Sequence, residues 1–215
     1  MRRRVISAAL ALCVMLTLLS GTALAAGQHP FTDVPQSHWA NEAVGYVYEN
    51  DLMNGVSATM FQPGGSLTRA MFVTILGRMA GAEEESGESG FADVPAGRWY
   101  SAYVAWAAGE GIVDGTGNGC FSPNSPVTRE QFAAILYRYA QLQGQDVSNQ
   151  ADLSAYLDAG KLSHYAQSPM AWAVAEGLIR GVSETALCPK ASATRAQAAV
   201  LLVRLAGAEQ AAAAD

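Results

Sequence analysis

Three arginines occupy the same position in three similar segments of the chain. Arg69, Arg129 and Arg195 each follow a threonine, and each lies fourteen residues after a glycine. The residues after each arginine predict a helix, and a helix N-terminus already carries partial positive charge, so a cation is unfavourable there. A guanidinium beside free backbone N–H groups suits a carboxylate or a ketal acid. The repeated arginine therefore predicts a bound anion.

An ion pair within the protein would also explain these arginines. Aspartates stand at equivalent positions in the three segments: Asp33, Asp93 and Asp158. An exposed ion pair adds at most about 1 kcal/mol, so stability alone is a weak reason for the arrangement. Both roles remain open from the sequence. A second set of arginines, near the carboxyl ends of the same helices, needs only the helix dipole as an explanation. This second set is Arg78, Arg138 and Arg204.

One unit of sequence occurs three times. The first two copies begin at Phe31 and Phe91, and all their landmarks are offset by 60 residues. The third copy begins at Tyr156, and from Tyr165 onward its offset from the second copy is 66 residues. This pattern predicts an all-α chain of three helix-loop-helix repeats, over residues 28–82, 88–143 and 152–207. The alanine-rich segment 208–215 is expected to be a disordered tail.

The second helix of each repeat has the clearest signals. Its expected N-caps are Thr68, Thr128 and Thr194. Gln131 and Gln197 complete a capping box in the second and third copies, whereas the first copy has Met71 at this position. Apolar residues recur on one face of each helix. One helix pair cannot bury such a face alone, so we expect the three long helices to pack around a shared core.

Glycines and aromatic residues recur around the first helix of each repeat. The glycines, expected to end that helix as left-handed C-caps, are Gly55, Gly115 and Gly181. The aromatic residues at the helix start are Trp39, Trp99 and Tyr165. Their flat apolar faces could stack on sugar rings, or they could be part of the core.

The first 25 residues have the features of a secretory signal peptide. Arg2, Arg3 and Arg4 precede an apolar run, and Ala23-Leu24-Ala25 fits a cleavage site. An uncleaved membrane anchor is the alternative. Without the three arginines, 10 basic side chains face 19 acidic ones. This balance opposes binding to nucleic acid or to an anionic membrane surface, and no membrane span is expected after cleavage.

No pattern of catalytic or metal-binding residues is present. The chain has no Gly-x-Ser-x-Gly motif, no phosphate loop and no His/Cys cluster with metal-ligand spacing. We therefore expect neither an enzyme nor a cofactor. Cys120 and Cys188 could form at most one bridge, and small buried side chains are the default expectation for them.

Taken together, the landmarks resemble the S-layer homology (SLH) family. In the first copy they are Phe31-Thr32-Asp33-Val34-Pro35, His38-Trp39-Ala40, Gly55, Phe61-Gln62-Pro63 and Thr68-Arg69-Ala70-Met71. The resemblance covers residues 28–207 and implies a pseudo-threefold bundle with one long helix per repeat. It also implies grooves between repeats that bind secondary cell-wall polysaccharide, often pyruvylated, with the three glycines letting the glycan approach the backbone. A secreted, wall-associated protein, anchored without a covalent bond, would result.

The chain departs from the SLH pattern at several positions. The glutamate that ends the family's Thr-Arg-Ala-Glu motif is replaced by Met71, Gln131 and Gln197, and Tyr165 replaces a tryptophan. The third copy also lacks the Val-Pro turn. An alternative function is a protein-interaction or self-assembly module of the cell envelope, with an envelope protein as partner, because an acidic bundle could pack laterally in such a layer.

Overall fold

The computed structural model describes residues 28–82 and 88–212. The predicted signal peptide falls in residues 1–27, which lie outside the described residues, as do 83–87 and 213–215. Over the two described ranges the chain is helical, and its only β pairing consists of isolated bridges. The prediction of an all-α fold is therefore confirmed.

Each repeat contributes one short and one long helix. The short helices are α1 (Asn41–Glu49), α3 (Ser101–Gly109) and α5 (Gln167–Ala175). The long helices are α2 (Arg69–Met79), α4 (Arg129–Leu142) and α6 (Arg195–Ala212). Two 3-10 turns, η1 (Ala159–Lys161) and η2 (His164–Ala166), precede α5.

The predicted threonine caps are present at all three long helices. The Thr68 hydroxyl accepts a hydrogen bond from the backbone N–H of Met71. Thr128 and Thr194 form full capping boxes, in which the glutamine side chain three residues later also accepts from the threonine N–H. Threonine is therefore the N-cap of each long helix, because its side chain accepts a hydrogen bond from a first-turn N–H group that has no partner within the helix.

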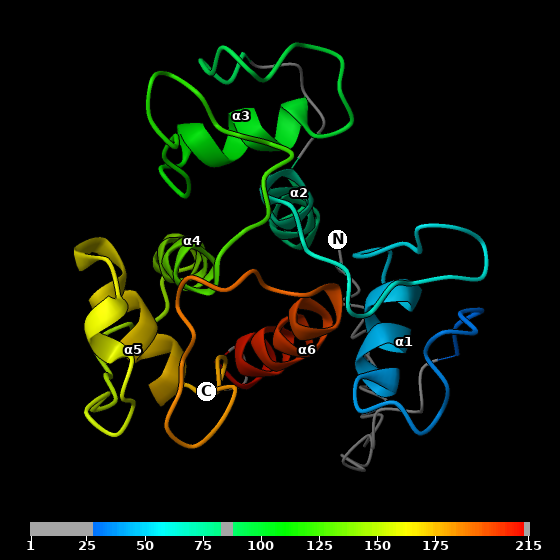
Figure 1. The fold of residues 1–215 in the computed structure, drawn as a ribbon. Helices are drawn as coiled ribbons and strands as arrows, with labels where there is room; N and C mark the ends of the chain where they lie inside the picture. Colours follow the sequence, from blue (N-terminus) through cyan, green and yellow to red (C-terminus); the bar gives the residue numbers. More distant parts are fainter. Residues whose placement is uncertain (1–27, 83–87, 213–215) are drawn as a thin grey trace, which may run out of the picture.

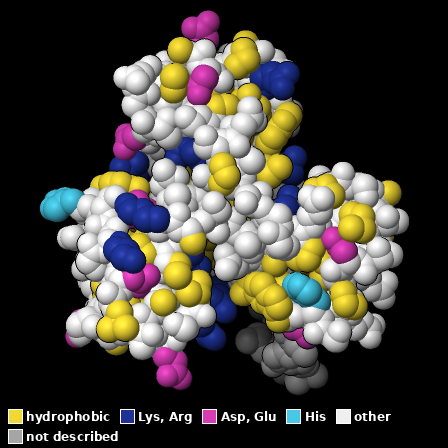
Figure 2. All heavy atoms as spheres, viewed as in Figure 1, with side chains coloured by type: hydrophobic (Ala, Val, Ile, Leu, Met, Phe, Trp, Pro, Cys, Tyr) yellow, Lys and Arg dark blue, Asp and Glu magenta, His cyan; other side chains and the backbone are white. Residues whose placement is uncertain are grey.

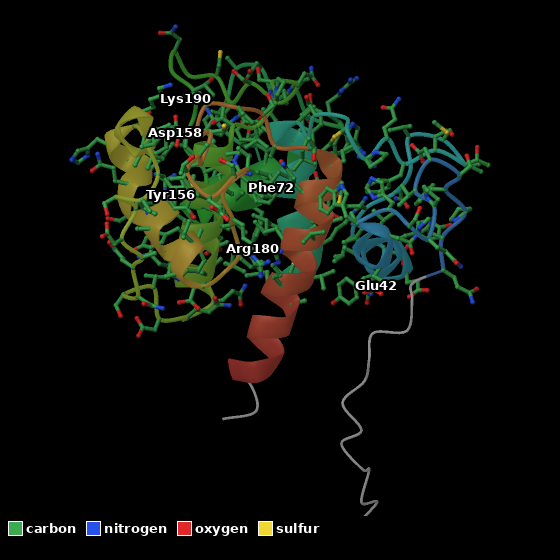
Figure 3. The ribbon with its side chains drawn as sticks, turned by 60° about the horizontal axis from the view of Figure 1, so that its bottom comes forward. Glu42, Phe72, Tyr156, Asp158, Arg180 and Lys190 are labelled. Carbon is green, nitrogen blue, oxygen red and sulfur yellow. The ribbon has the colours of Figure 1, made fainter. Side chains whose placement is uncertain are left out.

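The short helices pack on long helices of other repeats. α3 packs on α2, α5 packs on α4, and α1 closes the cycle by packing on α6. Figure 1 shows the result as three lobes around the place where the long helices meet. Phe72 of α2 lies there, and its ring centroid is 4.2 Å from that of Phe132 of α4 (Figure 3). The predicted apolar faces are thus buried, but each lobe combines helices from two repeats.

Three backbone hydrogen bonds connect the repeats at this centre. Leu67 N–H donates to the carbonyl of Ala193, Val127 N–H to that of Leu67, and Ala193 N–H to that of Val127, each at 2.9 Å. All three residues are buried. The bonds form a closed ring in which each repeat donates once and accepts once. The three repeats are therefore connected in cyclic order, and the pseudo-threefold arrangement implied by the SLH resemblance stays a prediction.

The three repeated glycines are not C-caps, so that prediction is wrong. Each short helix ends six residues earlier, and none of the three glycines has a positive φ. A side chain is excluded there for steric reasons. A Cβ on Gly115 would lie 2.6 Å from the carbonyl oxygen of Cys120 and 3.1 Å from the ring of Phe91. At Gly181, a Cβ would lie 2.8 Å from the ring of Tyr156.

The last long helix continues further than the sequence suggests. α6 extends through Ala212, five residues into the segment that we expected to be a disordered tail. Alanine has the highest helix propensity, so an alanine-rich run can prolong a helix that is already formed. None of the helices in the described ranges is long and apolar enough to cross a bilayer.

We expect Gly115→Ala to destabilise the protein by about 1–3 kcal/mol, because the new methyl group would press on Cys120 and Phe91. Thermal unfolding followed by circular dichroism measures the loss. Gly109→Ala is the matched control, since a Cβ there meets nothing within 4 Å and alanine favours the helix. Equal melting temperatures for the two variants would contradict the steric explanation.

Candidate functional site

The three repeated arginines connect each repeat to another. Arg69 Nε donates to the carbonyl oxygen of Phe121 at 2.8 Å, and its Nη2 donates to that of Asp114 at 3.1 Å. The equivalent acceptors are Leu187 and Arg180 for Arg129, and Phe61 and Asn54 for Arg195. All three arginines are buried, with exposed fractions of 5–7%. Each guanidinium is therefore a structural link as well as a candidate ligand for an anion.

The backbone donors beside each arginine are already occupied. Arg69 N–H donates to the carbonyl of Ser125, and Ala70 N–H to that of Pro123, both at 3.0 Å. The other two long helices begin with equivalent hydrogen bonds. The expectation that free N–H groups converge with the guanidinium on one anion is therefore wrong. Backbone carbonyls of another repeat surround each helix start, and their partial negative charge offsets a cation at this position.

The repeated aspartates hold the loops that face the arginines. Asp93 accepts from the N–H groups of Phe121 and Ser122, each at 2.7 Å. Ser122 has a φ of 60°, so two successive N–H groups can point at one carboxylate. Asp33 and Asp158 make the same pair of contacts in their own repeats. The aspartates thus make no ion pair with the arginines, although Phe121 bonds to Asp93 through its N–H and to Arg69 through its carbonyl.

These contacts shift the ionisation of both partners. Burial lowers the pKa of Arg69, and the nearby charge of Asp93 partly offsets this effect. Hydrogen bonds from Leu187 and Cys188 lower the pKa of Asp158, the first of them being the largest influence. The Asp158 carboxylate is therefore held in its charged form. Arg69 stays protonated in spite of the lowering, because the ordinary pKa of arginine lies far above neutral pH.

Two grooves run along long helices and combine all three repeats. The α4 groove has a volume of about 400 Å³, and the α6 groove one of about 200 Å³. The α4 groove is defined by Arg69, Asp114, Gly115, Gln131, Arg138 and Tyr165. The α6 groove is defined by Arg129, Arg180, Gly181, Gln197, Arg204 and Trp39. Figure 2 shows Lys and Arg side chains in the crevices between the lobes. Each groove thus receives its repeated arginine from one repeat and its aromatic residue from another.

The aromatic residues before the short helices are exposed. Trp39, Trp99 and Tyr165 have exposed fractions of 65%, 56% and 49%. They are therefore not part of the core, which was one of the two roles left open by the sequence. Trp39 lines the α6 groove and Tyr165 lines the α4 groove. The change from tryptophan to tyrosine in the third repeat thus alters the groove on the long helix of the second.

Glu130 is a site residue that the sequence analysis missed. It is buried, and it accepts hydrogen bonds from Lys190 Nζ at 2.5 Å, from the N–H and hydroxyl of Ser163, both at 3.0 Å, and from the Tyr165 hydroxyl at 3.3 Å. Burial alone would raise the pKa of Glu130, but the bonds from Lys190 and Ser163 outweigh it and lower the pKa. The sequence signal was an acid at a position where the other two repeats have alanine.

The two grooves also differ at a position where the repeats have different residues. The residue before the groove glycine is Asp114 in the second repeat and Arg180 in the third. Asp114 pairs with Arg138 at 2.6 Å in the α4 groove. In the α6 groove, Arg204 instead donates to the carbonyls of Gly177 and Leu178. This difference arises at a position where the repeats have different residues.

Comparison with known proteins identifies the family. The S-layer homology domain matches residues 30–71, 90–133 and 156–199, more than half of the chain. The chain belongs to the S-layer homology family. SLH membership makes it a cell-surface anchoring module and places it outside the cell, in association with the cell wall.

Several larger proteins contain a region similar to this SLH chain. An endoglucanase of Bacillus sp. (strain KSM-635) is 34% identical over 82% of the chain, which spans 18% of that enzyme. An S-layer protein of Bacillus thuringiensis subsp. finitimus is 29% identical over 84% of the chain and 22% of its own length. A cellulosome-anchoring protein of Acetivibrio thermocellus is 26% identical over 82% of the chain, which spans 39% of that protein. The SLH chain therefore spans well under half of each relative.

We expect Arg129→Ala to lower the free energy of unfolding by about 3 kcal/mol, because two carbonyls would each lose a hydrogen bond from a charged donor. Arg129→Lys should also destabilise, since an ammonium lacks the planar fork. Arg138→Ala in the same helix is the control. It removes a partly exposed ion pair and should cost no more than about 1 kcal/mol. Similar urea midpoints for the alanine variants would contradict the structural role of Arg129.

The Glu130 cluster predicts a pH-dependent stability. Because the folded-state pKa of Glu130 is lowered, its contribution is complete above the unfolded pKa, about 4.3, and is lost as pH falls through the folded pKa. Glu130→Gln should therefore have a lower melting temperature than the native protein at pH 7. This difference in melting temperature should shrink below pH 4. Melting temperatures across that range measure it. Glu184→Gln, at an exposed position, should melt at the same temperature as the native protein. A difference in melting temperature for Glu130→Gln that does not change with pH would contradict this role of the Glu130 carboxylate.

Proposed function

We propose that this SLH module anchors its protein by binding an acidic secondary cell-wall polysaccharide, bearing a pyruvate ketal, in its grooves. The observation that carries the proposal is the pairing, in each of two grooves, of a buried arginine with an exposed aromatic residue from a different repeat. A guanidinium suits a ketal carboxylate, and an aromatic face suits the adjoining sugar ring.

The arginines retain donors for such a ligand despite their structural bonds. Arg69 and Arg129 use Nε and Nη2 for backbone carbonyls, and their Nη1 groups make no hydrogen bond to a described residue. Because two nitrogens are fixed by the backbone, the third is held in place before a ligand arrives. Binding then costs little side-chain ordering.

A third, equivalent site on α2 is part of the proposal. By analogy with the other two sites, its residues would be Arg195 at the start of α6, Asn54 and Gly55 in the facing loop, and Trp99 as the aromatic residue. Arg195 contacts the carbonyl of Asn54, as Arg69 contacts that of Asp114. Met71 stands here where the other two helices have glutamine, so this site would offer one fewer polar group.

The names of the relatives support anchoring rather than catalysis. One is a cellulosome-anchoring protein and another is an S-layer protein. The endoglucanase shares only the 18% of its length that resembles this chain. In the described residues, no group of three His, Cys, Asp or Glu side chains could hold a metal ion. We therefore propose a non-enzymatic role for this chain.

We expect Trp39→Ala to reduce retention on purified wall sacculi without lowering the melting temperature. Trp39 is exposed and lines the α6 groove, so its loss removes stacking area and little packing. Loss of one stacked base costs about 1–3 kcal/mol in nucleic-acid complexes, and a sugar ring should fall at or below this range. Leu157→Ala, an exposed apolar residue outside both grooves, is the control. Equal retention of the two variants would exclude stacking at Trp39.

The same assay distinguishes glycan binding from protein assembly. Mild acid removes pyruvate ketals from the sacculi, and the glycan proposal requires retention to fall after this treatment. Retention that survives the treatment, and that depends instead on wall-bound protein, would favour the alternative of an envelope assembly module.

A further inference from the structure

The two grooves carry different formal charges. In the α4 groove, the carboxylate of Asp114 neutralises Arg138, so Arg69 supplies the remaining charge. In the α6 groove, Arg180 replaces the aspartate, and the three defining cations are Arg129, Arg180 and Arg204. No acidic residue lines the α6 groove. The formal balance is therefore +1 in the α4 groove and +3 in the α6 groove.

No described residue forms an ion pair with an arginine of the α6 groove. The ion pairs within the described residues are Arg138–Asp114 and Lys190–Glu130, so none of the three arginines has one. Burial lowers the pKa of Arg204, and the charge of Arg180 lowers it further. The chain as a whole has a formal net charge of −6, so the cluster is not a consequence of a basic composition.

Two of the three guanidinium groups are fixed by backbone carbonyls. Arg129 is bonded to the carbonyls of Leu187 and Arg180, and Arg204 to those of Gly177 and Leu178. Arg180 is exposed, and it lies beside α6 in Figure 3. Two fixed cations and one exposed cation therefore line one small cavity, which Trp39 also lines.

We propose that the α6 groove binds a glycan segment that carries two acidic groups, with Arg180 as the residue that selects for the second. The α4 groove takes a segment with one acidic group. This inference rests on the proposed function, because it assumes that acidic glycan enters the grooves. A volume of about 200 Å³ is below the roughly 300–1,000 Å³ of typical ligand pockets. The groove thus accommodates the charged end of a chain rather than a long stretch.

Two matched disaccharides test the proposal by calorimetry on the mature chain. Both carry a pyruvate ketal on the terminal hexose, and the second sugar is glucose in one and glucuronic acid in the other. The native protein should bind the two-acid probe more tightly, by about tenfold at low salt. Arg180→Asn, which introduces the residue that the first repeat has, should abolish this preference.

Further variants and a site-specific readout complete the test. Lys161→Asn removes the same charge outside both grooves and should keep the preference, as should Arg180→Lys. The indole N–H resonance of Trp39 reports which groove the two-acid probe enters. Equal binding of both probes, or a preference that survives Arg180→Asn, would overturn the inference and leave the proposed function standing. Failure of both probes to bind the native chain would refute the proposed function as well.

Discussion

The structure depends on one repeated interaction, in which a buried guanidinium donates to two backbone carbonyls of another repeat. Arg195 closes the cycle, because its acceptors Phe61 and Asn54 lie in the first repeat. A charged donor satisfies carbonyls in loops that have no regular secondary structure to pair with. The helix N-terminus is tolerable for this cation because carbonyls of the partner loop line it. A single repeat would have neither these acceptors nor a partner for its short helix.

This arrangement makes the grooves a consequence of the fold. The residues that join the repeats also form the walls of the α4 and α6 grooves, so each groove exists only where all three repeats are correctly docked. Arginine is suited to both tasks, because it has five donors and the fold uses only part of them. The shared residues therefore supply the frame, while the residues that vary among repeats, such as Asp114 and Arg180, set the charge of each groove.

The sequence predicted the local structure better than the contacts between repeats. The threonine caps and the apolar faces of the long helices depend on residues three to eleven positions apart, and these predictions were confirmed. The acceptors of Arg69 are backbone carbonyls 45 and 52 residues away, and any residue type can supply them. The three glycines were misassigned because steric exclusion by a distant ring has the same sequence signature as a C-cap. Glu130 and Arg180 were missed because they distinguish the repeats instead of relating them.

The proposed function has an acidic protein bind an acidic glycan, so the attraction between them would have to act over short distances. At physiological salt the field of an exposed charge is screened within about 8 Å, so the overall negative charge has little effect inside a groove. The buried arginines are screened less, because protein covers them on most sides. The net negative charge then opposes non-specific encounters with any polyanion. Specific binding depends instead on the charges inside the grooves. Under the proposed function, an anionic polymer would be retained only where its acidic groups match the positions of the guanidiniums, which is the selectivity that an anchor in a wall of many anionic polymers needs.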